Sequence, residues 1–488
     1  MIKSKLPVTE GSALELEGVP RDGAPDLVDP LSVEKVGATG QRRKLIPWAI
    51  KGGTAILDQG LVSGSNFVIG ILLARWLTPD QYGAYAVAFS AFLLVLMLYQ
   101  SLVLEPLSVF GAATYRDCGG DYLKVLLSLH LPVGMVICFV FCAAGGVALQ
   151  LGQRNGLPGA LCGVGIAGPL ILLFWLGRRM LYSQLSPLPA AAGALLYCAV
   201  AIGGLLVAAR HNLLSPLSAL LLMGAGSTVA SFLLLACLRL RLPSGAGAPS
   251  LADVSRRHWG YGSWALASAA IMWIPTNIFY PLVSSFSGMV QAAELRALMN
   301  FAMPMAQTYA ALASLLLPYA ANVQRRKGSA GVGILMRRIT WLYVIGALAY
   351  WAVLLLFKGP IFRLVYSGRY TEVAYLLPVV ALGSVSWSAF LGPATGLRAM
   401  ESPASVFAAA SFASCLSFAI GVPATWAFGV RGAVWAMALA EALAFVPALV
   451  LLRRKVRSTM PVPVSSAGSD FPPIAGERCC LETSGPNP

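Results

Sequence analysis

The stretch "WAIKGGTAILDQGLVSGSNFVIGILLARWL", residues 48–77, is apolar enough to cross a membrane, yet it carries Lys51, Asp58 and Asn66. About 20 mostly apolar residues suffice to span a hydrocarbon core of roughly 30 Å. Ionisable side chains inside a bilayer are costly unless they face protein or water. The segment therefore predicts a membrane-crossing helix that has a polar environment on one of its faces.

Similar apolar stretches recur along the whole chain of 488 residues, of which 57% are hydrophobic and only 11% are charged. Soluble globular proteins are nearer 25% charged, and a membrane β-barrel would show alternating strands of about ten residues. The sequence thus predicts an all-α polytopic membrane protein with about 12 transmembrane helices. The expected spans are residues 48–76, 82–111, 123–150, 157–183, 188–210, 214–240, 256–286, 290–321, 335–357, 371–397, 403–428 and 430–453.

The net charge of +15 follows the ends of these spans. With the N-terminus in the cytoplasm, 22 lysines and arginines flank the inner ends and 7 flank the outer ends. Cytoplasmic loops carry the excess of basic residues in membrane proteins, so both termini are predicted to be cytoplasmic. The basic charge is explained by topology and does not indicate a nucleic-acid partner. Seven of the nine cysteines lie in or beside apolar segments without paired spacing, which indicates neither a disulfide framework nor a metal site.

The chain divides into two similar halves at an offset of 212 residues, at which features such as Pro106 and Pro318 coincide. Two six-helix bundles in a parallel repeat are expected, an arrangement common in secondary transporters. The predicted parts are a disordered tail (1–44), a first bundle (45–241), a cytoplasmic linker (242–255), a second bundle (256–455) and a disordered tail (456–488).

Polar residues form stripes along some of the expected helices, since positions seven apart return to nearly the same face. Lys51, Asp58 and Ser65 form one stripe, and Arg296, Asn300, Gln307 form another. These stripes are expected to line a hydrated cavity between the two halves.

Structural explanations stand beside this functional one. Lys51 and Glu105 lie at nearly the same depth and would neutralise each other. Asp58 lies deep in the core with no cation near it in this simple register, and it either lines the cavity, couples to an ion or is a hydrogen-bonded packing acid. Arg296 contacts an anion, pairs with Glu294 or extends to the outer surface. Glu441 in the last span is an ion-coupling candidate or a structural residue.

Three further prolines, Pro275, Pro304 and Pro318, are expected to bend or break the seventh and eighth spans, which suits gating and plain packing equally.

Three stretches resemble a known family: "LLARWLTPDQYGAYAVAFSAF" (72–92), "GRRMLYSQLSPLPAA" (177–191) and "YSGRYTEVAYLLPVVALG" (366–383). They are similar to bacterial polysaccharide flippases, the Wzx-type branch of the multidrug/oligosaccharidyl-lipid/polysaccharide exporter superfamily. The resemblance extends diffusely over roughly residues 45–455. It implies alternating access between two bundles in the bacterial inner membrane and a cargo of oligosaccharide carried on undecaprenyl pyrophosphate. The exported units would serve exopolysaccharide or lipopolysaccharide biosynthesis.

Physical reasoning then gives roles to residues of such a cavity, since the family has no universal motif that fixes them. Lys51, Arg75 and Arg296 would attract the pyrophosphate, and Asn300 and Gln307 would present polar groups to the glycan. Asp58, Glu105 and Glu441 would exchange a coupling ion, H⁺ or Na⁺, and no other cofactor is implied. Membrane lipid, a polysaccharide polymerase and chain-length or export proteins are the expected partners.

Other functions remain open on the sequence. A drug/cation antiporter of the same superfamily would favour an acidic pocket, against which Arg296 counts. A membrane glycan polymerase or ligase would usually expose a large outer loop, and the longest expected here is about 358–370. No nucleotide-binding loop or nucleophile motif occurs, so a transporter rather than an enzyme is predicted.

Overall fold

The computed structural model describes residues 38–242 and 249–458, and all of its regular structure in these ranges is helical. The all-α prediction is therefore confirmed. The predicted tails outside residues 38–458, and residues 243–248 of the expected linker, lie outside the described residues. The helices are α1 Ala38–Trp76, α2 Pro79–Tyr99, η1 Gln100–Leu104, α3 Glu105–Phe110, α4 Gly119–Gln150, α5 Leu157–Ser183, α6 Pro187–Arg210, α7 Pro216–Arg241, α8 Leu251–Asn277, α9 Phe279–Ser287, α10 Met289–Asn300, α11 Met303–Leu356, α12 Lys358–Tyr366, η2 Thr371–Leu376, α13 Leu377–Ala399, α14 Pro403–Leu416, η3 Ser417–Gly421 and α15 Val422–Ser458.

The chain falls into two structural units, one ending at Ile50 and the other beginning at Lys51. The first unit contributes the described start of α1, which is helical from Ala38, ahead of the expected start at residue 48. Every contact described below lies within the second unit.

Local sequence signals explain where several helices begin. Thr78 caps α2. Its hydroxyl accepts from the backbone N–H of Gln81, and the side-chain oxygen of Gln81 accepts from the backbone N–H of Thr78. Pro79 then occupies the first turn, where its missing N–H costs nothing. Ser215 and Ser218 form the same reciprocal pair at α7. These caps fix the short turns between successive spans.

Nine helices among the described residues are long and apolar enough to cross a membrane. Two of them, Met303–Leu356 and Ala404–Ser458, have 54 and 55 residues. At 1.5 Å per residue each is more than twice the length that one crossing of roughly 30 Å needs. Both contain a glycine with left-handed backbone, Gly328 at φ 63° and Gly429 at φ 58°, where two expected spans meet. Expected span seven corresponds to α8 with α9, and span eight to α10 with the start of α11. Pro304 stands in the first turn of α11, after a break in the helix.

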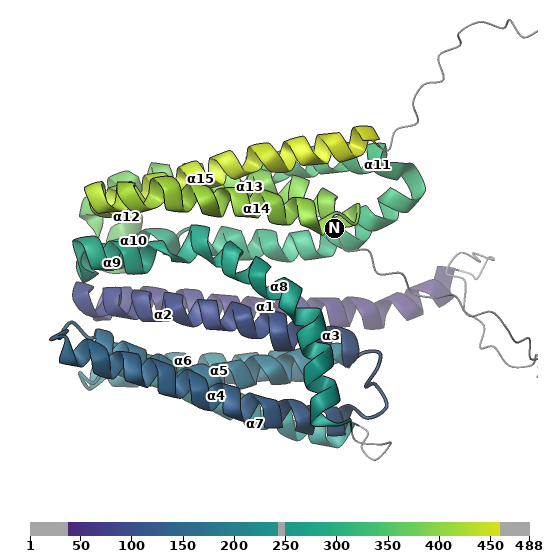
Figure 1. Cartoon of the computed structure of the whole chain (residues 1–488), viewed down its shortest axis with the longest axis horizontal. Coiled ribbons are helices and arrows are strands. Elements are labelled where there is room, and N and C mark those ends of the chain that lie inside the picture. Colours follow the sequence, from purple (N-terminus) through teal and green to yellow (C-terminus); the bar gives the residue numbers. More distant parts are fainter. Residues whose placement is uncertain (1–37, 243–248, 459–488) are drawn as a thin grey trace, which may run out of the picture. The chain divides into compact units, whose positions relative to one another are not determined.

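Helices of each half pack mainly on one another. In the first half α5 packs against α4 and α7, and α6 against α7; in the second, α13 packs against α11 and α15. The halves meet chiefly through α2, which contacts α8, α9 and α10. Figure 1 shows α8 bending as it passes from the region of α3 toward α9 and α10. One large cluster of buried apolar residues extends from Val62 to Ala438 and includes both halves.

Large apolar side chains also cover the exterior. Phe139, Leu151 and Leu364 are 74%, 75% and 77% exposed. Extended exposed apolar surface is unfavourable in water, whereas hydrocarbon accommodates it, provided that helices satisfy the backbone internally. The exposure pattern fits a multi-pass membrane protein.

Candidate functional site

Arg296 on α10 lies buried where the second half meets α2 of the first, with only 6% of its surface exposed. Its guanidinium lies 5.4 Å from the centre of the Phe89 ring and 5.8 Å from that of Tyr280. Within the described ranges no carboxylate forms an ion pair with Arg296, and its Nε has no hydrogen-bond partner. The expected alternatives, pairing with Glu294 and extension to the surface, are therefore wrong for this conformation.

The aromatic rings offset only part of the cost of burying this cation. A cation–π contact contributes about 0.5–2 kcal/mol, whereas removing an ion from water costs several kcal/mol. An anion entering between the halves would supply the missing counter-charge. Arg296 is thus a buried cation whose charge is not balanced by a paired carboxylate among the described residues.

Asn300 follows one turn later and connects the halves by hydrogen bonds. Its Nδ2 donates to the Tyr82 hydroxyl at 2.9 Å and to the Tyr366 hydroxyl at 3.3 Å. Its Oδ1 has no hydrogen-bond partner in the described part of the chain and lies against Gly70 of α1. The structure therefore places Arg296 and Asn300 together, as their shared stripe predicts.

The contact between α2 and α10 is closely packed, and we call it the outer seam because the predicted topology puts it at the outer end. A Cβ on Gly83 would overlap the Met289 carbonyl, so only glycine permits this approach of the two backbones. Arg369, also from the second half, donates to the Leu77 carbonyl at the end of α1 at 2.6 Å. The outer seam is closed in this structure.

Asp58 has a different environment from the one expected. It is fully buried, and its Oδ2 accepts from Arg178 Nη2 and from the Tyr182 hydroxyl, both at 2.6 Å. The expectation that no cation lies near Asp58 is wrong, as is the placement of its stripe on an open cavity: Ser65 is 2% exposed too. The reason is tertiary, because α5 brings Arg178 from the inner end of another span into the interior of the first half.

The remaining substrate candidates do not gather around Arg296. Lys51 and Arg75 are exposed near opposite ends of α1. Gln307 is exposed on α11, where its Oε1 accepts from the Ser63 hydroxyl of α1 at 3.4 Å. This contact joins the two halves through polar, accessible side chains. A polar surface shared by α1 and α11 thus exists, as the stripes predict, but it excludes Asp58.

The other two carboxylates lie apart from each other. Glu105 is half-buried and lines a cavity between the halves, and its charge interacts with that of Arg179. Glu441 on α15 lies against Gly383 of α13. Neither carboxylate forms an ion pair in the described ranges.

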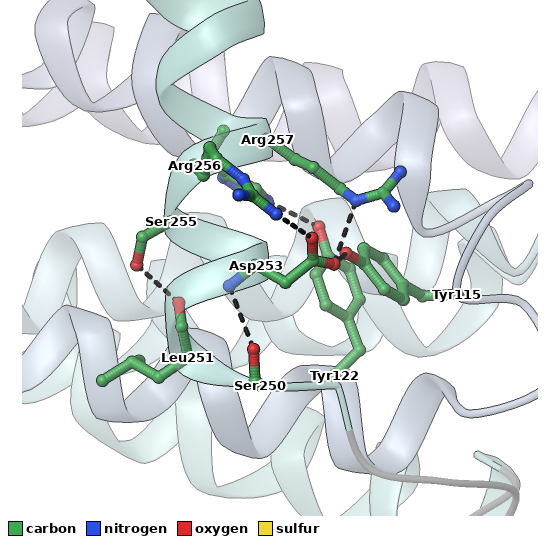
Figure 2. A network of polar contacts seen from close by, with 9 residues as sticks. Tyr115, Tyr122, Ser250, Leu251, Asp253, Ser255, Arg256 and Arg257 are labelled. Atoms are coloured by element: carbon green, nitrogen blue, oxygen red, sulfur yellow. Dashed lines mark hydrogen bonds and ion pairs between the residues drawn. The ribbon is translucent and has the colours of Figure 1, made fainter.

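A second set of polar contacts crosses between the halves at the expected inner end (Figure 2). Asp253, in the first turn of α8, accepts from Arg257 Nε at 3.0 Å, from Arg256 Nη2 at 3.3 Å and from the Tyr115 hydroxyl at 3.2 Å. His258 on the same helix contacts the Tyr122 hydroxyl at 2.7 Å. The arginine bonds lower the pKa of Asp253, with Arg257 contributing most, while partial burial and this carboxylate raise the pKa of Tyr115. The start of α8 is thereby attached to the first half.

Sequence reasoning missed several of these residues. Arg178 and Arg398 were counted as topology signals, yet the first is 3% exposed and the second lines the cavity with Glu105. The sequence pattern does not single out the tyrosines of this site, because tyrosine is common in apolar helices; they are Tyr82, Tyr280 and Tyr366. The pair of adjacent arginines near the end of expected span four was the available clue, since adjacent positions on a helix point about 100° apart and so face different surroundings.

No protein-family model matches the sequence, and no curated protein matches it either. Solved structures do share its fold. An inward-facing multidrug resistance MATE family transporter of the MOP superfamily superposes with a TM-score of 0.72 at 13% identity, over 83% of this chain and 98% of that one. The lipid II flippase MurJ, in an inward closed conformation, gives 0.65 at 13% identity, over 83% and 87%. A MOP superfamily transporter from Pyrococcus furiosus, with a binding pocket of reverse polarity, gives 0.61 at 14% identity, over 83% and 94%.

These similarities establish the architecture as that of the MOP superfamily transporters. An outward-facing MATE family transporter gives a lower TM-score, 0.61, than the inward-facing one. At 12–14% identity the likeness concerns the fold alone.

Proposed function

We propose that this protein translocates undecaprenyl-pyrophosphate-linked oligosaccharide across the bacterial inner membrane by alternating access. The observation that carries the proposal is Arg296. This cation is buried between the halves against aromatic side chains, and none of the carboxylates in the described ranges pairs with it. A pyrophosphate is a strong anionic acceptor for a guanidinium. The likeness in fold to a lipid II flippase supports a lipid-linked cargo.

The closed outer seam gives this cation a role in the cycle. With the seam closed, Arg296 lies without a counter-ion in a low-dielectric interior, where electrostatic interactions are strong. An anionic head group that enters from the inner side gains its most favourable partner beside the seam. A ligand shifts a conformational equilibrium only if it binds the two conformations with different affinities. An anion that stays bound to Arg296 while the seam opens provides this difference. The prenyl chain remains in lipid throughout.

Coupling to H⁺ or Na⁺ is assigned to Glu105 or Glu441 rather than to Asp58. A coupling carboxylate must change its charge during the cycle. Asp58 already forms a buried ion pair with Arg178 at 2.6 Å, whereas neither glutamate forms an ion pair in the described ranges.

The proposal is tested by locating lipid-linked single repeat units in cells that lack the protein. Deletion should trap these units on the cytoplasmic leaflet, inaccessible to a periplasmic probe enzyme, and polymer should disappear. Arg296→Gln should lower export at least about tenfold, the factor that a lost charge-assisted hydrogen bond predicts. Arg363→Gln, an exposed arginine at the outer end, is the matched control and should export normally, with protein levels checked by immunoblot.

Single units that still reach the periplasm in the deletion strain would show that the protein acts after translocation, as a polymerase or ligase does. Normal export by Arg296→Gln at normal protein level would remove the observation on which the proposal depends.

A drug/cation antiporter is the second candidate, and Glu441 favours it as a carboxylate at mid-membrane without a paired cation. Efflux of a cationic dye such as ethidium that is lost in Glu441→Gln, with lipid-linked units normally distributed, would favour the antiporter.

A further inference from the structure

A cavity of about 420 Å³ opens between the two halves near their expected inner end, away from Arg296. The first half contributes α2, η1 and α3, and the second contributes α8, α13 and α14. A site formed by both halves changes shape whenever they move relative to each other. Such a cavity is placed to bind a transported molecule in one conformation and to release it in another.

The polar wall on the first half is produced by an irregular stretch of helix. The π-helical turn η1 interrupts the span between α2 and α3, and π turns are often found at functional sites. This turn directs Gln100 and Ser101 to the cavity, with Glu105 directly after it. Ser101 also donates to the Ala265 carbonyl of α8 at 3.5 Å, so the turn contacts the opposite half.

Arg398, at the end of α13, provides the cation of the second half. Its side chain forms no hydrogen bond or ion pair with any residue that the structure describes. Glu105 on the facing wall has its own electrostatic partner, Arg179. Among the residues that line the cavity, Arg398 is therefore the one whose positive charge can bind an anionic ligand.

The rest of the cavity wall is apolar, and part of it reaches the exterior. Met272 of α8 and Phe407 of α14 line the cavity and are 39% and 38% exposed. A ligand with a charged head and an apolar tail fits this combination, because its head meets Arg398 and its tail leaves past these two side chains.

We infer that this cavity binds the pyrophosphate of a prenyl-linked lipid, with Arg398 as the phosphate-binding residue and Met272 and Phe407 in contact with the start of the prenyl chain. The inference rests on the proposed function and assigns the site where cargo is first held, ahead of Arg296. The side-chain amide of Gln100 donates to the phosphate oxygens.

The experiment measures equilibrium binding of farnesyl pyrophosphate to the purified full-length protein in nanodiscs. Inorganic pyrophosphate and farnesol are competitors that each carry one half of the recognised chemistry. Farnesyl pyrophosphate should bind at least about tenfold more tightly than either competitor. Arg398→Gln should weaken the binding of farnesyl pyrophosphate about 10- to 100-fold, as expected for a charge-assisted contact. Arg398→Lys, which keeps the charge but loses the planar fork, should fall in between.

Arg454→Gln is the control, because this arginine is exposed at the inner end and does not line the cavity; it should bind as wild type does. Wild-type affinity in Arg398→Gln overturns the inference, as does equal competition by pyrophosphate or farnesol alone. Arg398-dependent binding in a protein whose deletion leaves lipid-linked units normally distributed would preserve this site and refute the flippase. Units trapped on the cytoplasmic leaflet, together with binding that does not depend on Arg398, would support the flippase and refute this site.

Discussion

Asp58 and Arg178 form an ion pair in which both side chains are almost completely buried, at 0% and 4% exposure. The ion pair joins one carboxylate oxygen to one guanidinium nitrogen. The other carboxylate oxygen, Asp58 Oδ1, and Arg178 Nε have no hydrogen-bond partner among the described residues. Such a pair adds little net stability, but loss of one partner leaves an isolated buried charge. We therefore interpret it as a fixed structural link between α1 and α5.

Asp58→Asn should destabilise the protein strongly, by about 3–5 kcal/mol, because Arg178 keeps its charge without compensation. Arg178→Gln should cost a similar amount, and the double variant Asp58→Asn/Arg178→Gln should lose clearly less than the sum. Thermal unfolding of the purified variants in detergent measures this. Additive losses would show that the two side chains are not energetically coupled.

The helix α8 is the element that most directly connects the halves. Its N-terminal part is held to the first half by Tyr115 and Tyr122 (Figure 2). Near its C-terminal end it contacts α2, where Trp273 Nε1 donates to the Ser90 carbonyl at 2.9 Å. Its far end continues into α9 and α10, which carries Arg296. Movement of the inner end can therefore reach the outer seam through three consecutive helices, of which α9 and α10 are separated by a turn at Gly288 (φ 90°).

Hydrogen exchange at the start of α8 should depend on Asp253 and not on pH in the neutral range. Because Arg257 and Arg256 lower the pKa of Asp253, the carboxylate remains charged at every pH above its usual value of about 3.9. The contact is lost only as pH falls through the lowered pKa.

Asp253→Asn and Tyr115→Phe should each raise the exchange of the first α8 amides, by similar factors at about pH 6 and pH 8 once intrinsic rates are corrected. Ser255→Ala, which removes only a bond to the Leu251 carbonyl within the helix, is the control. A change in the wild type between these two pH values would mean that another group, such as His258, controls this end.

The orientation of the whole molecule follows from the distribution of basic residues between the two ends of the helices. We predict that the loop at Asp117 faces the cytoplasm and the loop at Gln153 faces the periplasm. Single cysteines at these exposed positions, in a background without native cysteines, should react differently with a membrane-impermeant maleimide. Asp117→Cys should react only after permeabilisation of the inner membrane, and Gln153→Cys before it. The opposite pattern would show that the protein is inserted the other way round, and the proposed direction of transport would then be reversed.

The sequence by itself determined the helical membrane fold, the turns and the breaks at Pro304 and Gly429, because these depend on hydropathy, caps and backbone conformation within one segment. Helical periodicity also placed Arg296 and Asn300 on a common face.

Only the tertiary structure decided which partner each polar side chain meets. Asp58 faces Arg178, Arg296 pairs with no carboxylate in the part of the chain that the structure describes, and Arg398 lines a cavity. These outcomes depend on how helices distant in sequence rotate and pack against each other. Periodicity fixes the relative angles of side chains on one helix, but it carries no information about the neighbouring helix that each face contacts.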